Sequence, residues 1–176
     1  MKTNQKRFFL SEKEIPTQWY NIQAEMPNKP MPPLHPATRE ALKAEDLYGV
    51  FCKECSRQEL DQQHPWIDIP EPVRNLYRTY RSTPLVRAYG LERALDTPAH
   101  IYFKNESVSP VGSHKLNSAL AQAYYCKQEG VTNITTETGA GQWGTAVAYA
   151  AQVFGLETAV YQVKISYEQK PYRRSM

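Results

Sequence analysis

The chain has 176 residues, 41% of them hydrophobic, and a formal net charge of +3 from 21 Lys and Arg against 18 Asp and Glu. This length suits one domain or part of a larger one, and the basic residues are spread along the chain, so we expect no nucleic-acid partner. No apolar run approaches the roughly 20 residues of a membrane span, and residues 1–10 lack the apolar stretch of a signal peptide. We therefore expect no membrane partner and a cytoplasmic protein.

Proline is concentrated near the start of the chain, where residues 27–36 contain five of the 13 Pro. This stretch should be extended and irregular, like an arm that wraps another part of the protein. Two helices are expected after it: residues 37–59, broken near Gly49, and residues 71–80, where Pro72 suits the first helical turn.

Cys52 and Cys55, within the first of these helices, form a C-x-x-C pair. A structural zinc site would need a second pair of ligands at similar spacing, and the four His residues are scattered singly. Two unpaired thiols are therefore favoured over metal or redox chemistry, and we expect no metal site.

From residue 100 onward the sequence alternates between strand-like and helix-like segments. The expected strands are residues 100–103, 131–136 and 157–163; the expected helices are residues 114–129, 143–154 and 166–174, with loops at 107–113 and 138–142. Repetition of strand, loop and helix predicts an α/β fold: a parallel sheet with crossover helices and ligands beyond the carboxyl ends of its strands. Three strands make a thin sheet, so either the chain is a fragment or something else completes it. We assign residues 1–85 to an extended arm with helices and residues 86–176 to an incomplete α/β domain.

The helix after the first of these strands opens on Ser113, His114 and Lys115. Cations are disfavoured in the first turn, because the positive end of the helix dipole lies there. A bound phosphate would compensate, and together with burial it would favour the neutral amine of Lys115, the form that condenses with an aldehyde. The alternative is an exposed lysine whose stem lies along the surface.

The loop at residues 137–142, ETGAGQ, also lies between a strand and a helix. Its small residues allow backbone N–H groups to surround an anion such as a carboxylate, although an ordinary Gly-rich turn would look the same. If the two preceding strands are parallel neighbours, Lys115 and Glu137 project from the same edge of the sheet, beside two helix N-termini.

Four motifs together resemble the tryptophan synthase beta-subunit family, which has the type II fold of pyridoxal-phosphate (PLP) enzymes. They are RSTPL at residues 81–85, YFKNE at 102–106, GSHKLN at 112–117 and ETGAGQ at 137–142. Their order and spacing agree with the family, and related enzymes such as cysteine synthases and hydroxy-amino-acid dehydratases have a Ser or Thr-Gly-Asn loop where this chain has Glu137. The arm with WYNI at residues 19–22, Trp143, and residues 166–174 are similar to the second type of beta subunit. Leu116 and Ser82 depart from the usual pattern.

The resemblance implies a β-replacement that forms L-tryptophan from L-serine and indole. Lys115 would hold PLP and move the Cα proton of serine, and Glu137 would assist departure of the hydroxyl and position indole. His114 would lie near the PLP phosphate and Asn117 near its ring oxygen. The substrate carboxylate would be held by Thr138, Gly139, Ala140, Gly141 and Gln142. A homodimer is implied, and an alpha-subunit partner is doubtful.

Family members supply a Gly-rich phosphate loop and a residue facing the pyridine nitrogen from a second half, and neither motif is in this sequence. The chain is therefore either part of an active lyase or an inert fragment or non-catalytic binding module. A related PLP-dependent serine or threonine lyase is a further alternative; a dinucleotide-binding domain is disfavoured because no strand is followed by G-x-G-x-x-G. Lys170, Arg173 and Arg174 form a small basic cluster, either a solvated face or a salt-bridge group in domain closure.

Overall fold

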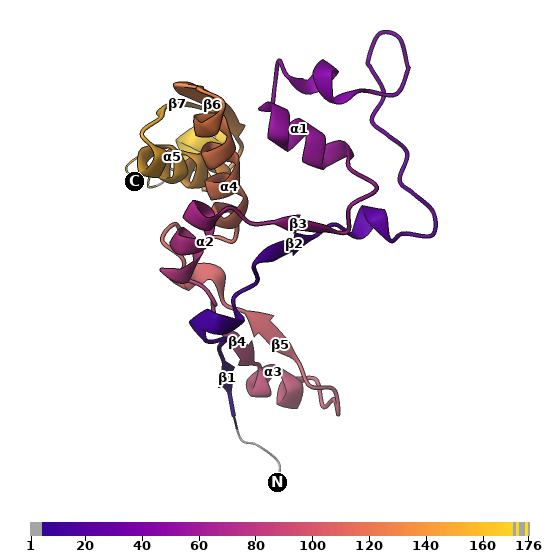
Figure 1. Cartoon of the computed structure of the whole chain (residues 1–176). Coiled ribbons are helices and arrows are strands. Elements are labelled where there is room, and N and C mark those ends of the chain that lie inside the picture. Colours follow the sequence, from indigo (N-terminus) through magenta and orange to yellow (C-terminus); the bar gives the residue numbers. More distant parts are fainter. Residues whose placement is uncertain (1–4, 171, 173–174, 176) are drawn as a thin grey trace.

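The computed structural model describes residues 5–170, 172 and 175, and in this part of the chain the strands form three separate sheets (Figure 1). The helices are α1 (Lys53–Leu60), α2 (Glu71–Arg78), α3 (Tyr89–Ala94), α4 (Lys115–Gln128), α5 (Gln142–Phe154) and α6 (Lys164–Gln169). The strands are β1 (Arg7–Phe8), β2 (Gln18–Tyr20), β3 (Trp66–Asp68), β4 (Leu85–Arg87), β5 (Tyr102–Lys104), β6 (Asn133–Thr138) and β7 (Glu157–Gln162). Short 3-10 helices lie at η1 (Glu12–Glu14), η2 (Ile22–Ala24), η3 (Ala44–Leu47) and η4 (Glu106–Val108).

Helices α4 and α5 pack against each other and provide most of the buried core. The apolar side chains buried there are largely small, so the helix backbones can approach closely. They are Leu116, Ala119, Leu120, Ala121 and Ala123 of α4 and Ala146, Val147, Ala150 and Ala151 of α5. Both helices were predicted within two residues of their ends. Helix α5 ends at Gly155, whose φ of 64° is left-handed and suits glycine.

The predicted β6–α5–β7 unit is confirmed. Strands β6 and β7 are parallel and in register from Asn133 opposite Glu157 to Thr138 opposite Gln162. Helix α5 connects them as the crossover, so the carboxyl end of β6 leads directly into the loop at residues 139–141. The strand lies two residues later than predicted.

The expectation that three strands share one parallel sheet is wrong for the first of them. Strand β5 is antiparallel to β4, which also pairs with β1, and Figure 1 shows this sheet with α3 well apart from β6 and β7. All three residues of β5 are exposed, whereas a strand inside a parallel sheet is buried on both faces. The alternation of strand-like and helix-like segments from residue 100 onward could not reveal this pairing. The partner strand, β4 at Leu85–Arg87, lies before the region in which the alternation begins.

The proline-rich stretch near the start of the chain is irregular, as predicted. Strand β2 pairs with β3, and residues 27–36 have no helix, as expected from their prolines. The helix expected over residues 37–59 is wrong in its first part, where Leu34 and Ala41 form an isolated bridge and Arg39 takes a φ of 63°. Helix α2 confirms the helix predicted at residues 71–80.

The helix predicted at residues 166–174 is described only in part. Helix α6 covers its start, and residues 171, 173 and 174 lie outside the described part.

Within the described residues, no helix combines the length and apolar character needed to cross a membrane.

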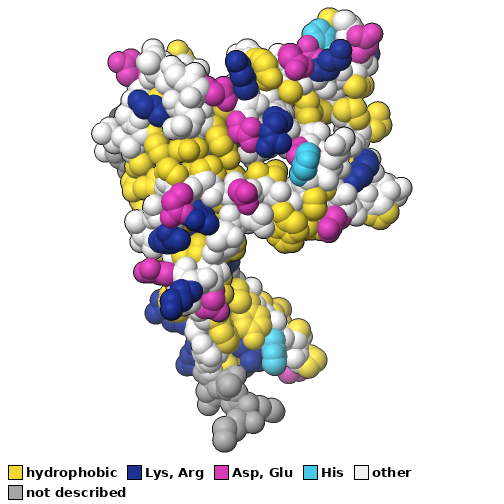
Figure 2. All heavy atoms as spheres, viewed as in Figure 1, with side chains coloured by type: hydrophobic (Ala, Val, Ile, Leu, Met, Phe, Trp, Pro, Cys, Tyr) yellow, Lys and Arg dark blue, Asp and Glu magenta, His cyan; other side chains and the backbone are white. Residues whose placement is uncertain are grey.

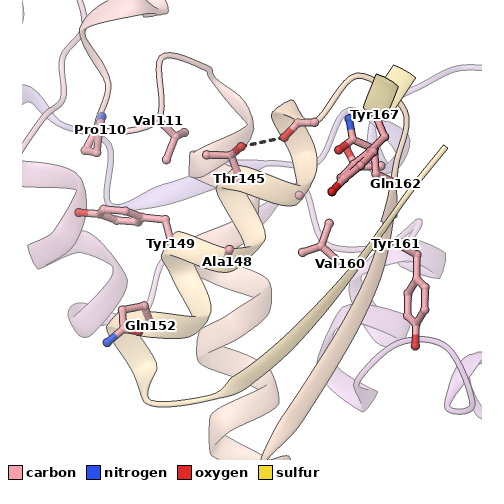
Figure 3. Close-up of a pocket in the computed structure, with 13 residues that line it drawn as sticks. Pro110, Val111, Thr145, Ala148, Tyr149, Gln152, Val160, Tyr161, Gln162 and Tyr167 are labelled. Carbon is pink, nitrogen blue, oxygen red and sulfur yellow. Dashed lines mark hydrogen bonds between the residues drawn. The ribbon is translucent and has the colours of Figure 1, made fainter. Parts of the chain in front are cut away.

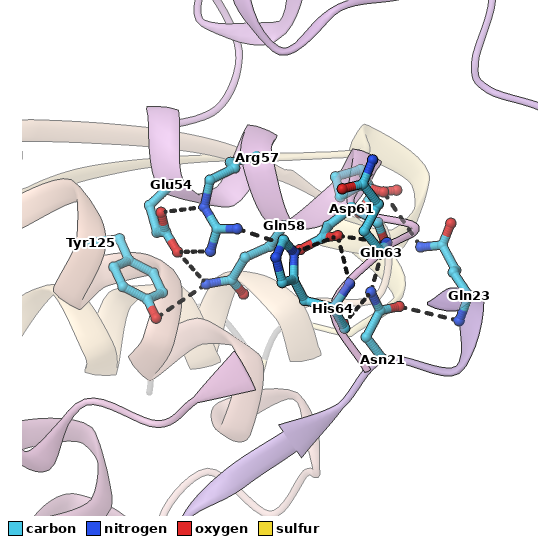
Figure 4. A network of polar contacts seen from close by, with 10 residues as sticks. Asn21, Gln23, Glu54, Arg57, Gln58, Asp61, Gln63, His64 and Tyr125 are labelled. Carbon is cyan, nitrogen blue, oxygen red and sulfur yellow. Dashed lines mark hydrogen bonds and ion pairs between the residues drawn. The ribbon is translucent and has the colours of Figure 1, made fainter. Parts of the chain in front are cut away.

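A polar network ties the arm to the end of α1 (Figure 4). The buried Asp61 carboxylate accepts the backbone N–H groups of Gln63 and His64, at 2.9 and 3.1 Å, and contacts the His64 ring at 2.9 Å. The Asn21 side chain, just after β2, donates to the Asp61 carbonyl at 2.7 Å. Burial alone would raise the pKa of Asp61, but the two N–H groups and the His64 ring outweigh it, so that pKa lies below its ordinary value.

We expect Asp61→Asn to lower the free energy of unfolding by about 1 to 3 kcal/mol at pH 7, because the amide accepts these N–H groups less strongly than the carboxylate does. A carboxyl whose native pKa is depressed stabilises the fold above its unfolded pKa of about 3.9, and this advantage disappears as the pH falls through the native pKa. Urea unfolding at pH 7 and near pH 3 measures the difference. A difference that is the same at both pH values would contradict the role given to the Asp61 charge.

Candidate active site

Two serines, Ser109 and Ser113, stabilise the loop that precedes Lys115 at the start of α4. The Ser109 hydroxyl donates to the Ser113 carbonyl at 3.0 Å and accepts the Ser113 N–H at 2.9 Å. Both serines are buried, and the Ser113 hydroxyl in turn accepts the N–H of Lys115 at 3.3 Å. These hydrogen bonds therefore fix the backbone at Lys115, whereas the Lys115 side chain is only half-buried.

The start of α4 is positively charged without a compensating acid. Its first turn contains no acidic residue, and His114 precedes Lys115 directly. In the part of the chain that the structure describes, neither Lys115 nor His114 makes a side-chain hydrogen bond or an ion pair. The positive end of a 14-residue helix and two basic side chains together suit an anionic ligand.

Two tyrosines of the α2 region hold Asn117, one turn into α4. The Tyr80 hydroxyl donates to Asn117 Oδ1 at 2.7 Å, and the Tyr77 hydroxyl donates to the Asn117 carbonyl at 2.6 Å. Burial raises the pKa of Tyr77 to about 12, so its hydroxyl stays protonated and remains a donor. The sequence did not point to either tyrosine: Tyr77 lies in the last turn of α2 and Tyr80 lies two residues after its end. The available signal was their spacing of three residues within the helix expected at residues 71–80.

The second loop has the form predicted for an anion site at a helix N-terminus. Gly141 precedes α5 with a φ of 99°, which glycine adopts without strain, and its carbonyl accepts the Thr145 hydroxyl at 2.8 Å. Gly139 and Ala140 are exposed, and no acceptor for the N–H groups of Gly139, Ala140 and Gly141 lies within hydrogen-bonding distance among the described residues. Gln142 is the first residue of α5, and Thr138, the last of β6, is buried.

One cavity of about 730 Å³ is lined by residues from both loops. Pro110 and Val111, from the loop before Lys115, lie on one side of α5, and Val160 and Gln162 of β7 lie on the other (Figure 3). Thr138 and Gly141 of the second loop also line it. Packing of α4 on α5 thus brings the two predicted loops together, although they do not follow adjacent strands of one sheet.

Glu137 lies at the other side of β6 from this cavity. It is exposed, and it lines a second cavity, of about 540 Å³, together with Trp143, Cys126 and Glu129. The indole N–H of Trp143 donates to the hydroxyl of Thr136 at 2.8 Å. This bond holds the Trp143 ring against the residue that directly precedes Glu137. Neither cavity is lined by Lys115, and no contact joins Lys115 to Glu137 within the described residues. The expectation that both project from one sheet edge is therefore wrong, because β5 and β6 belong to different sheets.

The basic cluster expected at Lys170, Arg173 and Arg174 is described only in part. Lys170 is half-buried after α6, and Arg173 and Arg174 lie outside the described residues.

Comparison with known proteins finds relatives along almost the whole chain. Residues 76–174 match the family described as pyridoxal-phosphate dependent enzyme. "Tryptophan synthase beta chain 2" of Aquifex aeolicus is 54% identical over 169 residues, 96% of this chain and 39% of the relative. The proteins of the same name from Thermotoga maritima and Methanosarcina mazei are 53% and 49% identical over 95% and 98% of this chain, and again 39% of the relative.

The chain thus spans about two fifths of the length of these curated relatives. The names of these relatives agree with the family indicated by the four motifs. They also agree with the similarity to the second type of beta subunit. The matched family region contains both loops and both helix N-termini described above. The chain belongs to the family of pyridoxal-phosphate dependent enzymes, and along almost its whole length it is similar to tryptophan synthase beta chains.

Proposed function

We propose that this chain carries the cofactor lysine and the substrate loop of an enzyme that forms L-tryptophan from L-serine and indole. The observation that supports this most directly is the placement of Lys115 at the N-terminus of α4 and of the loop at residues 139–141 at the N-terminus of α5, two helices that pack against each other. The names of relatives about 50% identical to the chain supply the reaction. Because the chain spans 39% of those relatives, the activity is proposed for a polypeptide of their length that includes these residues.

The residues at the start of α4 fit a phosphorylated aldehyde. Lys115 offers an amine without an acidic partner among the described residues, and His114 with the helix N-terminus offers a positive field for a phosphate. Asn117 keeps its Nδ2 group as a donor toward a ring oxygen, because Tyr80 occupies its Oδ1. When bound here, PLP supplies an electron sink for the Cα carbanion of the substrate.

The residues of this chain have three further roles in the proposed reaction: proton transfer at Cα, protonation of the leaving hydroxyl and binding of the substrate carboxylate. The Lys115 amine takes the Cα proton of L-serine and returns it at the end of the reaction. A Glu137 carboxyl oxygen protonates the departing serine hydroxyl and then orients indole. Thr138, Gly139, Ala140, Gly141 and Gln142 hold the substrate carboxylate through their backbone N–H groups and side-chain donors at the positive end of α5.

Lys115→Ala is the direct test of this proposal. The unsubstituted protein, mixed with PLP, should develop a visible absorption band that survives gel filtration, because the lysine amine holds the aldehyde covalently. Borohydride should abolish this visible band and leave the cofactor permanently attached to the protein, because hydride reduces the C=N bond to the lysine. Lys115→Ala should lose that band, whereas Lys127→Ala, in the last turn of the same helix, should keep it. The spectra are best recorded on this chain and on a polypeptide of the relatives' length. Retention of the band by Lys115→Ala in the longer polypeptide would falsify the assignment.

We also propose a homodimer in the cytoplasm that needs no alpha subunit. Large apolar side chains remain exposed along the arm, including Phe9, Ile22, Met31 and Val50, and Figure 2 shows hydrophobic side chains gathered over the region of α4 and α5. Such surface suits burial against other polypeptide. Light scattering on the longer polypeptide gives its mass in solution; a monomer would contradict this part of the proposal.

A further inference from the structure

The fold gathers all three cysteines of the chain at one place. Cys52 precedes α1, Cys55 lies in its first turn, and Cys126 lies in the last turn of α4, yet all three line the cavity of about 540 Å³ that Glu137 also lines. Each is a free thiol and each is partly exposed. The sequence predicted unpaired thiols at Cys52 and Cys55, and it gave no sign that Cys126, 74 positions from Cys52, joins them.

A carboxylate holds the two helix ends together around these sulfur atoms. Glu129, at the end of α4, accepts the backbone N–H groups of Lys53 and Glu54, at 2.8 and 3.0 Å. These are the first two N–H groups of α1, so the start of α1 is fixed against the end of α4. One turn further, Gln58 of α1 donates to the Tyr125 hydroxyl at 3.2 Å (Figure 4).

The surroundings favour a thiolate at Cys52 and thiols at its neighbours. Hydrogen bonds from the Cys126 and Cys55 thiols to the Cys52 sulfur lower the pKa of Cys52 well below its ordinary value. The same contacts raise the pKa of Cys55 and of Cys126. Cys52 also stands at the positive end of α1, a position that stabilises a thiolate. No group of three or more His, Cys, Asp or Glu within the described residues is arranged to hold a metal ion.

We propose that Cys52, Cys55 and Cys126 form a thiol–disulfide exchange site, in which Cys52 attacks a small-molecule disulfide and Cys126 resolves the product. The Cys52 thiolate forms a bond to one sulfur of the small disulfide, whose S–S bond breaks and releases one small thiol. Cys126 then gives up its proton and attacks Cys52, which releases the second small thiol. The protein loses two electrons and the small disulfide gains them, and the new S–S bond joins α1 to α4 on the wall of the cavity that Glu137 lines.

Trypsin separates the three cysteines, which makes the assignment directly measurable. Cleavage after Lys43, Lys53, Arg57, Lys115 and Lys127 leaves Cys52 in residues 44–53, Cys55 in residues 54–57 and Cys126 in residues 116–127. The folded 176-residue protein is reacted with oxidised glutathione, alkylated, digested and examined by mass spectrometry. The expected product is residues 44–53 linked to residues 116–127.

Three single variants distinguish the roles. Cys126→Ser should stop at glutathione bound to Cys52, and Cys52→Ser should react at least about tenfold more slowly. Cys55→Ser, whose hydroxyl can still donate to the Cys52 sulfur, should still form the link between Cys52 and Cys126. Circular dichroism first establishes that each variant is folded, and Cys→Ala replaces any serine variant that is not. A link between residues 44–53 and 54–57, equal reactivity of Cys52→Ser, or no reaction of the unsubstituted protein would each overturn the proposal.

Discussion

Replacement of Glu137 by Ala should lower the rate of tryptophan formation from serine and indole by about 10² to 10⁴-fold, the usual contribution of a positioned acid or base. The effect should fall mainly on kcat, because the role proposed for this carboxyl is on the departing hydroxyl, whereas the substrate carboxylate is assigned to the loop at residues 138–142. The rate is measured by tryptophan absorbance or chromatography in the polypeptide of the relatives' length.

Glu157→Ala is the matched control for Glu137→Ala. Both glutamates lie on the β6–β7 sheet, but Glu157 begins β7 at the opposite end, opposite Asn133. Its replacement should leave the rate within about twofold of the unsubstituted enzyme. Glu137→Gln separates the two tasks proposed for this residue: it retains the shape that orients indole and loses the transferable proton. A rate for Glu137→Ala close to that of the unsubstituted enzyme would exclude the role given to Glu137.

Gly144→Ala should destabilise the fold by about 1 to 3 kcal/mol, the typical cost of overpacking. A Cβ atom at this buried position in α5 would lie 2.5 Å from Val160 Cγ1 and 2.9 Å from Thr138 Cγ2. Neither atom belongs to a long flexible side chain, so α5 must move away from the β6–β7 sheet. Urea unfolding measures the loss. Thr138 also begins the substrate loop, so we expect serine binding in the longer polypeptide to weaken as well.

Gly90→Ala provides the comparison for Gly144→Ala. Gly90 lies inside α3, and a Cβ atom there would meet nothing within 4 Å. Alanine is a better helix former than glycine by about 1 kcal/mol, so this variant should be as stable as the unsubstituted protein or slightly more stable. If Gly144→Ala behaves like Gly90→Ala, the close packing of α5 on β7 does not limit stability as the structure implies.

Several features were predictable from sequence because they depend on residues that are near one another along the chain. Helix periodicity ending at Gly130 and Gly155 located α4 and α5, and β-branched residues located β6. Small residues after β6 predicted a loop at a helix N-terminus, and the motifs around Lys115 and Glu137 indicated the family. The domain boundary at residue 85 and the roles of the individual site residues stay predictions.

Tertiary structure alone decided which of these segments meet. Strand β5 looked like a member of the parallel sheet but pairs with β4 and, through it, with β1, because pairing depends on backbone groups far away in the sequence. Packing between α4 and α5 brings the two loops to one cavity, and docking of α1 on α4 brings Cys126 to Cys52. Local sequence specifies each helix, strand and turn, whereas contacts between them depend on which apolar faces are buried against each other when the chain folds.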